Sequence, residues 1–297
     1  MRYNARMARV LVIGSSNTDM FVKVGRLPSG GETILGESFY MAQGGKGANQ
    51  AVAARRAGAD VAFVGRVGAD PFGKAALDAL KAEGIDVQDL RVDPDHPSGV
   101  ALILVDPRGE NMIAVAPGAN MAVTPADVTA ERVRWADVVV LQLEIPLQSV
   151  EGAIRLARRE HRQVVLNYAP APKEPCQELL AEVDFVILNE SELAAAGFAD
   201  PEELQSQIRG TAILTLGARG VVYFDPDPKE VPAEKVTAVD TVGAGDAFVG
   251  TFSTFIAEGL GLVEAVRLAN RAAAITVTRK GAQPSLPTRR EIEDFRS

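Results

Sequence analysis

The chain has 297 residues, of which 47% are hydrophobic and 24% charged, so it can bury a large core in one large domain or two smaller ones. The net charge of −8 argues against a nucleic-acid groove, and no stretch reaches the roughly 18 apolar residues of a membrane span. The lone Cys176 excludes an intramolecular disulfide, and only two histidines, His96 and His161, leave little support for a histidine-rich metal site or a catalytic triad. We therefore expect a cytoplasmic protein that binds neither nucleic acid nor membrane.

Short apolar runs rich in β-branched residues predict strands that are covered on both faces of a sheet. In chain order these runs are 10–13, 61–64, 138–141, 164–166, 185–188 and 212–216. The first run follows a polar, basic segment in which Met7 is a second candidate for the start of the chain, with residues 1–6 then a loose extension.

Helical patterns alternate with these strands, at 48–57, 71–83, 147–159, 201–209 and 263–278. Alternating strands and helices predict an α/β fold, with a doubly wound and mostly parallel sheet flanked by helices. The proline-rich stretch at 225–232 is predicted to be a surface turn.

Two stretches interrupt the alternation. Residues 20–24 and 33–42 have strand character with no helix between them, and 99–105 with 112–115 reads as a β-hairpin. We infer a small antiparallel sheet inserted from about 18–42 and 98–116 into one domain that covers 8–297. Its role is either that of a lid or that of an edge decoration with no gating function.

Two glycine-rich segments each open directly into a helix. In the first, 43–50, no Ser or Thr follows Lys46 and the G-x-G-x-x-G spacing is missing, so it is neither a Walker A loop nor a dinucleotide-binding turn. Its backbone amides, Lys46 and Asn49 suit a polyhydroxylated ligand, and a flexible loop with a helix cap is the plainer alternative.

The second segment, 238–250, carries Asp240 and Asp246 around a glycine-rich turn. The first amides of a helix have no intrahelical partner and lie at the positive end of its dipole, so they form an anion site. A carboxylate beside such a site, as at Asp246, suits phosphoryl transfer because it can take the proton from an attacking hydroxyl. An aspartate that merely caps the helix is the alternative.

Together these segments resemble the two signatures of the ribokinase-type carbohydrate kinases, often called the PfkB family. The resemblance runs from about Val10 to Phe295 and is carried, in order, by 14–19, 30–33, 44–49, 117–120, 142–144, 166–171, 189–192, 215–220, 240–246 and 278–285. It implies a ribokinase-like fold whose small sheet covers the sugar and often forms a homodimer interface. It also implies transfer of the ATP γ-phosphoryl group to a primary hydroxyl, the 5-position of D-ribose.

The resemblance assigns roles to residues that match the motifs. Asp246 is the general base, with an anion hole at Gly243, Ala244 and Gly245. The sugar is held, together with Asp246, by Asn17, Asp19, Gly45, Lys46, Gly47, Asn49 and Glu144. An alternative reading makes Asn17 and Asp19 a turn pair and Glu144 a solvated loop charge.

The same resemblance implies sites for ATP, Mg²⁺ and K⁺. Asn189 and Glu192 would organise Mg²⁺ and the phosphates, although their spacing also suits a helix cap. The rest of the nucleotide would contact Thr215, Gly217, Arg219, Gly220, Gly245 and Asn270. The segment 215–220 also reads as a plain hairpin turn. The segment 194–211 is shorter than in typical members of the family, so no nucleotide contact is assigned there. The K⁺ ligands would be the side chains of Asp240 and Ser285 and the carbonyls of Val242, Thr276, Arg279 and Gly281.

Other activities stay open at this stage. A kinase of the same family for deoxyribose, fructose, a keto-deoxy sugar acid or a nucleoside is the nearest alternative. A sugar acid requires an arginine near the lid, and a nucleoside requires a wider, more aromatic pocket than 5% aromatic residues suggest. A non-catalytic sugar or nucleotide sensor is a more distant alternative, because the chain keeps Asp246.

Overall fold

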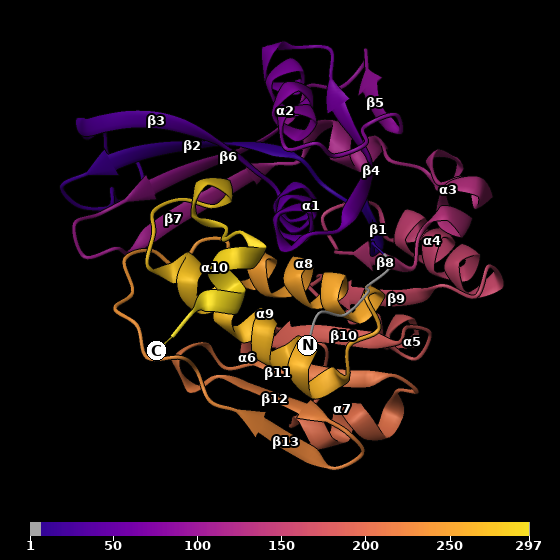
Figure 1. The fold of residues 1–297 in the computed structure, drawn as a ribbon. Helices are drawn as coiled ribbons and strands as arrows, with labels where there is room; N and C mark the ends of the chain where they lie inside the picture. The colour runs from indigo at the N-terminus through magenta and orange to yellow at the C-terminus, as the bar shows by residue number, and fades with distance from the viewer. Residues whose placement is uncertain (1–6, 297) are drawn as a thin grey trace.

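The computed structural model describes residues 7–296, so the extension expected at 1–6 lies outside the described residues. A sheet of nine strands runs through the body in the order β13-β12-β11-β10-β9-β8-β1-β4-β5 (Figure 1). All neighbours pair in parallel except β11-β12 and β12-β13, which confirms the mostly parallel sheet. The strands span Arg9–Ile13 (β1), Asp60–Gly68 (β4), Leu90–Asp93 (β5), Val138–Leu141 (β8), Gln163–Asn167 (β9), Phe185–Asn189 (β10), Thr211–Thr215 (β11), Val221–Phe224 (β12) and Pro228–Val231 (β13).

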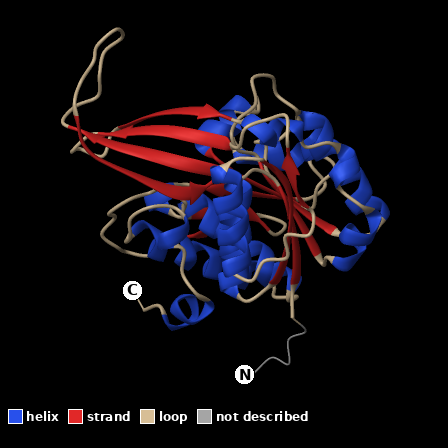
Figure 2. Cartoon of the chain, turned by 90° about the horizontal axis from the view of Figure 1, so that it is seen from above, coloured by secondary structure: helices blue, strands red, loops and turns tan. Residues whose placement is uncertain are grey.

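Helices cover both faces of this sheet (Figure 2). Alternate residues of β1 enter different cores: Val10 and Val12 pack on one face, and Leu11 and Ile13 on the other. This alternation explains why the strand is apolar at every position. The first core includes α1 (Lys46–Ala57), α2 (Pro71–Ala82), α8 (Ala244–Ala257), α9 (Leu262–Val277) and α10 (Arg289–Asp294); the second includes α3 (Ala130–Trp135), α4 (Leu147–Arg159), α5 (Gln177–Leu180), α6 (Glu190–Ala195) and α7 (Pro201–Gln207).

The six predicted strands and five predicted helices are all present, with ends that differ by a few residues. The prediction of a surface turn at 225–232 is wrong in part, because residues 228–231 form the edge strand β13 against β12. Proline fits there because its missing N–H costs nothing where no further strand pairs.

The small sheet contains β2 (Asn17–Val24), β3 (Gly36–Gly44), β6 (Gly99–Val105) and β7 (Asn111–Ala116), in the order β3-β2-β6-β7. It extends away from the body at the left of Figure 2. The pairs β2-β3 and β6-β7 are antiparallel as predicted, but β2 and β6 pair in parallel, so the expectation of an antiparallel sheet is wrong for that one pair.

The reason for the mixed sheet is that β2 and β6 both start at the body and run outward. Asn17 opens one strand opposite Gly99 of the other. A Cβ on Gly99 would lie 2.1 Å from Asn17 Oδ1, so only glycine permits this approach.

Among the described residues no helix is long and apolar enough to cross a membrane.

Candidate active site

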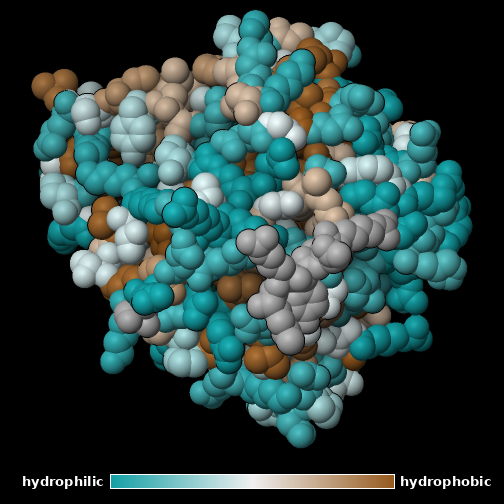
Figure 3. Space-filling view, viewed as in Figure 1, coloured by the Kyte–Doolittle hydropathy of each residue, from teal (hydrophilic) through white to brown (hydrophobic). Residues whose placement is uncertain are grey.

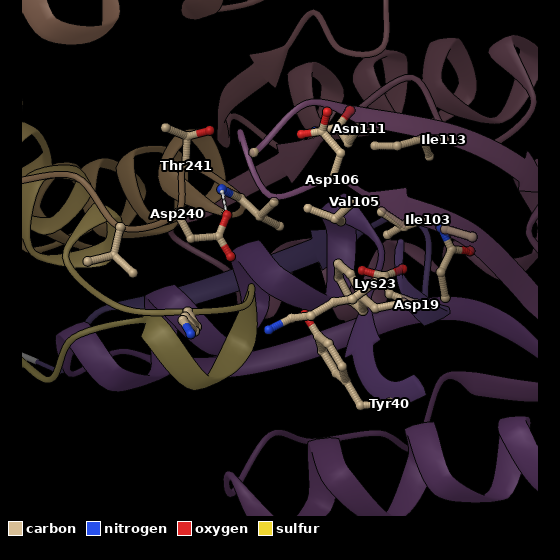
Figure 4. Close-up of a pocket in the computed structure, with 18 of the residues that line it drawn as sticks. Asp19, Lys23, Tyr40, Ile103, Val105, Asp106, Asn111, Ile113, Asp240 and Thr241 are labelled. Atoms are coloured by element: carbon tan, nitrogen blue, oxygen red, sulfur yellow. Dashed lines mark hydrogen bonds between the residues drawn. The ribbon is translucent and has the colours of Figure 1, made fainter. Parts of the chain in front are cut away.

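A cavity of about 810 Å³ lies between the small sheet and the carboxyl ends of the parallel strands. Figure 4 shows Asp240 and Thr241, from the loop before α8, facing Tyr40, Ile103 and Val105 of the small sheet. Predicted site residues that line it are Asn17, Asp19, Gly45, Lys46, Asn49, Glu144, Asp240, Val242, Gly243 and Asp246. Open α/β sheets bind ligands at this edge, where the chain order reverses on either side of β1.

Asp246 lies in the first turn of α8, with 8% of its surface exposed. Its Oδ2 accepts a hydrogen bond from Asn49 Nδ2 at 2.9 Å, and its Oδ1 accepts one from Gln50 Nε2 at 3.0 Å. Burial raises the pKa of Asp246, while the charge of Lys46 and these two hydrogen bonds act in the opposite direction. A carboxylate held this way is oriented, dry and basic enough to accept a proton from a hydroxyl.

The turn before Asp246 presents free backbone donors to the cavity. Gly243 has a φ of 81°, a left-handed conformation that glycine adopts without strain. The amides of Gly245 and Asp246 donate to no described residue, whereas Ala244 N bonds to Thr241 O at 3.3 Å. A Cβ on Gly245 would meet nothing within 4 Å, so the turn is open on that side. These features are the requirements of an anion hole at a helix N-terminus.

Amides and carboxylates suited to sugar hydroxyls lie around Asp246. Asn17 is nearly buried, and its Oδ1 accepts from Asn120 Nδ2 at 2.8 Å. Asn49 Oδ1 is buried and lacks a hydrogen-bond partner among the described residues, although a buried acceptor normally has one. Burial, Glu144 and Asp246 together raise the pKa of Asp19 to about 7.

The segment at Gly45 and Lys46 begins α1 against the end of β1. A Cβ on Gly45 would lie 2.7 Å from Asn17 N, and its φ of 88° also requires glycine. Glu144 Oε2 accepts from Lys46 N at 2.9 Å and from the hydroxyl of Ser15. Glu144 therefore closes the N-terminus of α1 and also lines the cavity.

Lys46 brings a cation to this acidic site. Burial by itself would lower the pKa of the Lys46 ammonium, but Asp246, Glu144 and Glu192 together raise it. Lys46 therefore carries its charge at neutral pH, where it can face a phosphate. Gly47 does not line the cavity; it serves packing, because a Cβ there would lie 2.6 Å from Ser15 N.

A buried network behind Asp246 was not predicted from the sequence. Gln142 Nε2 donates to Gln50 Oε1 at 2.6 Å, and Gln50 Nε2 is shared between Asn167 Oδ1 and Asp246 Oδ1, both at 3.0 Å. Gln142 and Asn167 fall inside motifs used for the resemblance and Gln50 directly follows one, but spacing gives no sign that segments more than 90 residues apart share one amide network.

The lining contributed by the small sheet was also missed. Phe21 stacks on Tyr40 with ring centroids 4.6 Å apart, and Ala101 and Ile103 complete an apolar wall. Arg108 lies at the hairpin tip beside the cavity, but its guanidinium bonds to Asp106 at 3.0 Å and Glu110 at 2.8 Å. That arginine is already neutralised, which weakens the sugar-acid alternative.

The residues expected to hold the nucleotide lie outside the cavity lining. Asn189 and Glu192 form a capping box at α6: Asn189 Oδ1 accepts from Glu192 N at 2.9 Å and Glu192 Oε2 from Asn189 N at 2.8 Å. Glu192 Oε1 has no partner among the described residues, so one oxygen remains for an ion or water. Burial raises the pKa of Glu192, while the Asn189 amide and Lys46 act in the opposite direction.

The remaining nucleotide-side residues occupy a turn and a helix. Gly217 and Gly220, with φ of 56° and 103°, bound the turn (η3, Gly217–Arg219) from β11 to β12, which confirms the hairpin. In this region Arg219 pairs with Glu190, and Thr215 Oγ1 donates to Leu188 O. Asn270 Nδ2 donates to Pro232 O at 2.8 Å, so its side chain is engaged within the protein.

Two segments expected to hold a monovalent cation lie side by side. Asp240 Oδ1 accepts from Val242 N at 3.0 Å and Oδ2 from Gly281 N at 2.9 Å. Ser285 is fully buried and donates to Ala282 O, and Thr276 is also fully buried. No backbone N–H of the described residues donates to the carbonyl oxygen of Arg279, whose side chain pairs with Glu291. The donors are oxygens, as a hard cation requires. The described residues include no cluster of three or more His, Cys, Asp or Glu side chains.

Comparisons with known proteins agree with this geometry. Residues 7–289 match the family model described as pfkB family carbohydrate kinase. The chain is 39% identical to a ribokinase of Bacillus subtilis, covering 98% of this chain and all of that protein, and 34% identical to a deoxyribokinase of Salmonella typhi over 97% and 98%. A structure of Arabidopsis thaliana ribokinase complexed with ribose and ATP superposes with a TM-score of 0.88 at 31% identity, covering 98% of this chain and 100% of that one.

Proposed function

Because the chain belongs to the pfkB family of carbohydrate kinases, we propose that it transfers the γ-phosphoryl group of ATP to the 5-hydroxyl of D-ribose. The observation that carries the proposal is the convergence of Asp246, the free amides of the α8 N-terminus and the sugar-type ligands Asn49 and Asp19 on one cavity. The products are ribose 5-phosphate and ADP.

The reaction follows from what surrounds Asp246. The ribose 5-hydroxyl gives its proton to the Asp246 carboxylate while its oxygen bonds to the γ-phosphorus, and the bond from that phosphorus to the ADP oxygen breaks. The amides of Gly245 and Asp246, with Lys46, stabilise the negative charge on the transferred group. Asn49 and Gln50 hold the base in place through the step.

Two ions fit the donors that the chain offers. Glu192, with one free carboxylate oxygen, and Asn189 would hold Mg²⁺ through water, which suits an ion that keeps most of its hydration shell. Asp240 and Ser285, with the carbonyls of Val242, Thr276, Arg279 and Gly281, would hold K⁺ next to the anion hole. Bound there, the two cations supply positive charge to the phosphates and to the turn at Gly243.

The small sheet would close over the sugar, and its outer face supports a homodimer. Pocket-facing residues such as Phe21, Tyr40 and Ile103 alternate with outward-facing ones. Figure 3 shows apolar side chains gathered along the small sheet at the upper left. The exposed outward-facing residues include Phe39 (60% exposed), Met41 (54%), Leu102 (54%) and Met112 (49%). A contiguous apolar patch of this kind marks an interaction surface. The cytoplasmic location remains a prediction from the composition of the sequence.

The test is ADP release with ATP and Mg²⁺ against D-ribose, 2-deoxy-D-ribose, fructose, a keto-deoxy sugar acid and a nucleoside, each with and without K⁺. We expect K⁺-stimulated turnover with D-ribose as the preferred acceptor. Turnover with 2-deoxy-D-ribose at equal or higher kcat/KM would favour a deoxyribokinase, the second candidate function, which the 34% identity to the deoxyribokinase supports. Sugar binding without turnover on any acceptor would overturn the kinase assignment.

A further inference from the structure

A second cavity, of about 570 Å³, lies at the opposite edge of the main sheet from the active site. It is formed where β9, β10 and β11 begin, at Gln163, Phe185 and Thr211. Because these strands are parallel, their amino ends meet at one edge, and the active site lies at the other. In Figure 1 the end of α4 lies at the right and the small sheet at the upper left.

The cavity wall is rich in cationic side chains. It contains Arg158, Arg162, Arg209 and His161 against two carboxylates, Glu182 and Asp184. These basic residues come from two separate chain segments, 158–162 and 209, that only the fold brings together. A site of this size lies within the usual range for small-molecule ligands.

Both carboxylates are already engaged. Glu182 pairs with Arg158 at 2.8 Å, and the same guanidinium donates to Glu182 O at 3.2 Å. Asp184 Oδ2 accepts from Val164 N at 2.7 Å. Neither carboxylate therefore forms an ion pair with Arg162 or Arg209.

The guanidinium groups of Arg162 and Arg209 therefore have no carboxylate partner in the cavity. Among the described residues neither makes a side-chain hydrogen bond or ion pair, although most arginines of this acidic chain do. Arg162 Nε is enclosed without an acceptor. With no acceptor in the described part of the protein, the Arg162 guanidinium keeps its charge and its terminal N–H donors available for a ligand from solvent.

The backbone fixes where Arg162 lies. His161 adopts a φ of 54°, the single positive value among the described non-glycine residues. This left-handed residue ends α4, with His161 N bonded to Arg158 O at 3.0 Å and Arg162 N to Ala157 O at 2.9 Å. The turn directs the chain from α4 into β9 and holds Arg162 at the cavity.

From these observations we propose that this cavity is a second anion site, which binds the phosphate group of inorganic phosphate or of a small phosphomonoester through Arg162 and Arg209. Guanidinium groups match the geometry of a phosphate with paired N–H donors and keep their charge at all physiological pH values. The three guanidinium groups of Arg158, Arg162 and Arg209 outnumber the carboxylates of Glu182 and Asp184 by one, so the charged lining as a whole favours an anion.

The experiment measures thermal unfolding of the full chain in inorganic phosphate and, separately, in ribose 5-phosphate, each at constant ionic strength set with chloride. For the wild type we expect a saturable rise in Tm of about 2 °C or more, because a ligand that binds the folded state alone stabilises it. The phosphate source with the lower half-saturating concentration is the one the site prefers. No saturable rise with either source would overturn the proposal.

Phosphate can also occupy the active site, so matched variants decide where it binds. Arg162→Gln with Arg209→Gln should abolish the rise, and Arg155→Gln should keep it. Arg155 lies on the same helix but pairs with Glu151 at 3.5 Å, outside the cavity lining. An undiminished rise in the double variant would place phosphate elsewhere and refute the site.

The exposed Arg209 provides a variant that does not depend on the packing around Arg162. Arg209→Gln by itself should weaken phosphate binding at least threefold and leave kcat for the kinase reaction unchanged. Phosphate affinity equal to that of the wild type would exclude Arg209 and contradict the proposal.

Discussion

Asp246 and Asn49 are 197 positions apart in the chain, yet Asn49 Nδ2 donates to Asp246 Oδ2 at 2.9 Å. The bond joins the first turns of α1 and α8, the two helices that open from the glycine-rich segments. It links the residue that we propose as the base to one that we propose as a sugar ligand. A sugar bound to Asn49 would therefore lie within reach of the base.

Asp246→Asn should lose about 10²–10⁴-fold in kcat, because the amide cannot accept the proton of the ribose 5-hydroxyl. The fold should tolerate the change, since it removes a buried charge. The Asn49 amide can rotate so that its unpartnered oxygen accepts from the new amide. Steady-state ADP release gives kcat, and calorimetry should show that ribose still binds. Turnover near the wild-type level would refute Asp246 as the base.

Gln50→Met should lower both stability and kcat. It removes the donor to Asp246 Oδ1 and leaves Asn167 and Gln142 without their partner, a cost of about 1–3 kcal/mol for each buried group left unpaired. Denaturant unfolding and kcat are the two measurements.

Gln205→Met is the matched control for this variant. Gln205 donates to Gly210 O and accepts from Ala212 N at 2.9 and 2.8 Å, so its loss should also lower stability, but kcat should not change. If the two variants affected kcat equally, Gln50 would have no special role in positioning the base.

Ribose binding should depend on pH through Asp19, whose pKa is raised to about 7 by burial, Glu144 and Asp246. Between pH 6 and 8 its ionised fraction rises from about one tenth to nine tenths, so the carboxylate becomes a better acceptor for sugar hydroxyls. We expect the KM for ribose to fall over this interval, and Asp19→Asn to remove the dependence. A KM profile unchanged in that variant would exclude Asp19 as the titrating group.

The same pKa has a consequence for stability with the opposite sign. Because the folded state holds the Asp19 proton up to about pH 7 and the unfolded state releases it near pH 4, this group makes folding less favourable as pH rises between those values. Unfolding of the wild type and of Asp19→Asn in denaturant, at pH 5 and at pH 7.5, should show a smaller loss in the variant.

Tyr168→Phe should reduce stability by about 1 kcal/mol and leave kcat unchanged. Tyr168 is fully buried, and its hydroxyl accepts from Cys176 N at 3.3 Å and lies 3.6 Å from Cys176 Sγ. Its role is thus to hold the segment that follows β9. A large loss of kcat in this variant would point to a role in the active site instead.

Met41→Lys combined with Leu102→Lys should convert a dimer to a monomer, since both side chains lie on the outward, exposed face of the small sheet. Light scattering gives the mass, and Val263→Lys, which adds a lysine at an exposed apolar residue of α9 outside the small sheet, is the control and should leave the mass unchanged. A wild-type mass of one chain, or a double variant that stays dimeric, would contradict association through this face.

The sequence by itself determined the α/β class and the positions of six of the nine strands in the main sheet and of the helices α1, α2, α4, α7 and α9, whereas β5, β13, α3, α5 and α10 were not predicted. A strand that is buried on both faces, such as β8, must be apolar at every position, so a continuous apolar run predicts it. A turn that needs a left-handed residue, such as the one before Asp246, requires glycine, so the glycines predict the turn. It also predicted ten of the residues that line the active-site cavity, because they lie just after strands or at the glycine-rich starts of helices.

Only the tertiary structure decided how distant segments pair. Three features join segments that are separated by tens to more than a hundred residues. They are the parallel register of β2 and β6, the amide network of Gln142, Gln50 and Asn167, and the basic cavity at Arg162 and Arg209. The spacing of apolar residues and glycines within a segment indicates which backbone conformation that segment prefers. Hydrogen bonds and charges between segments depend on the packing of the whole chain, so no single motif contains them.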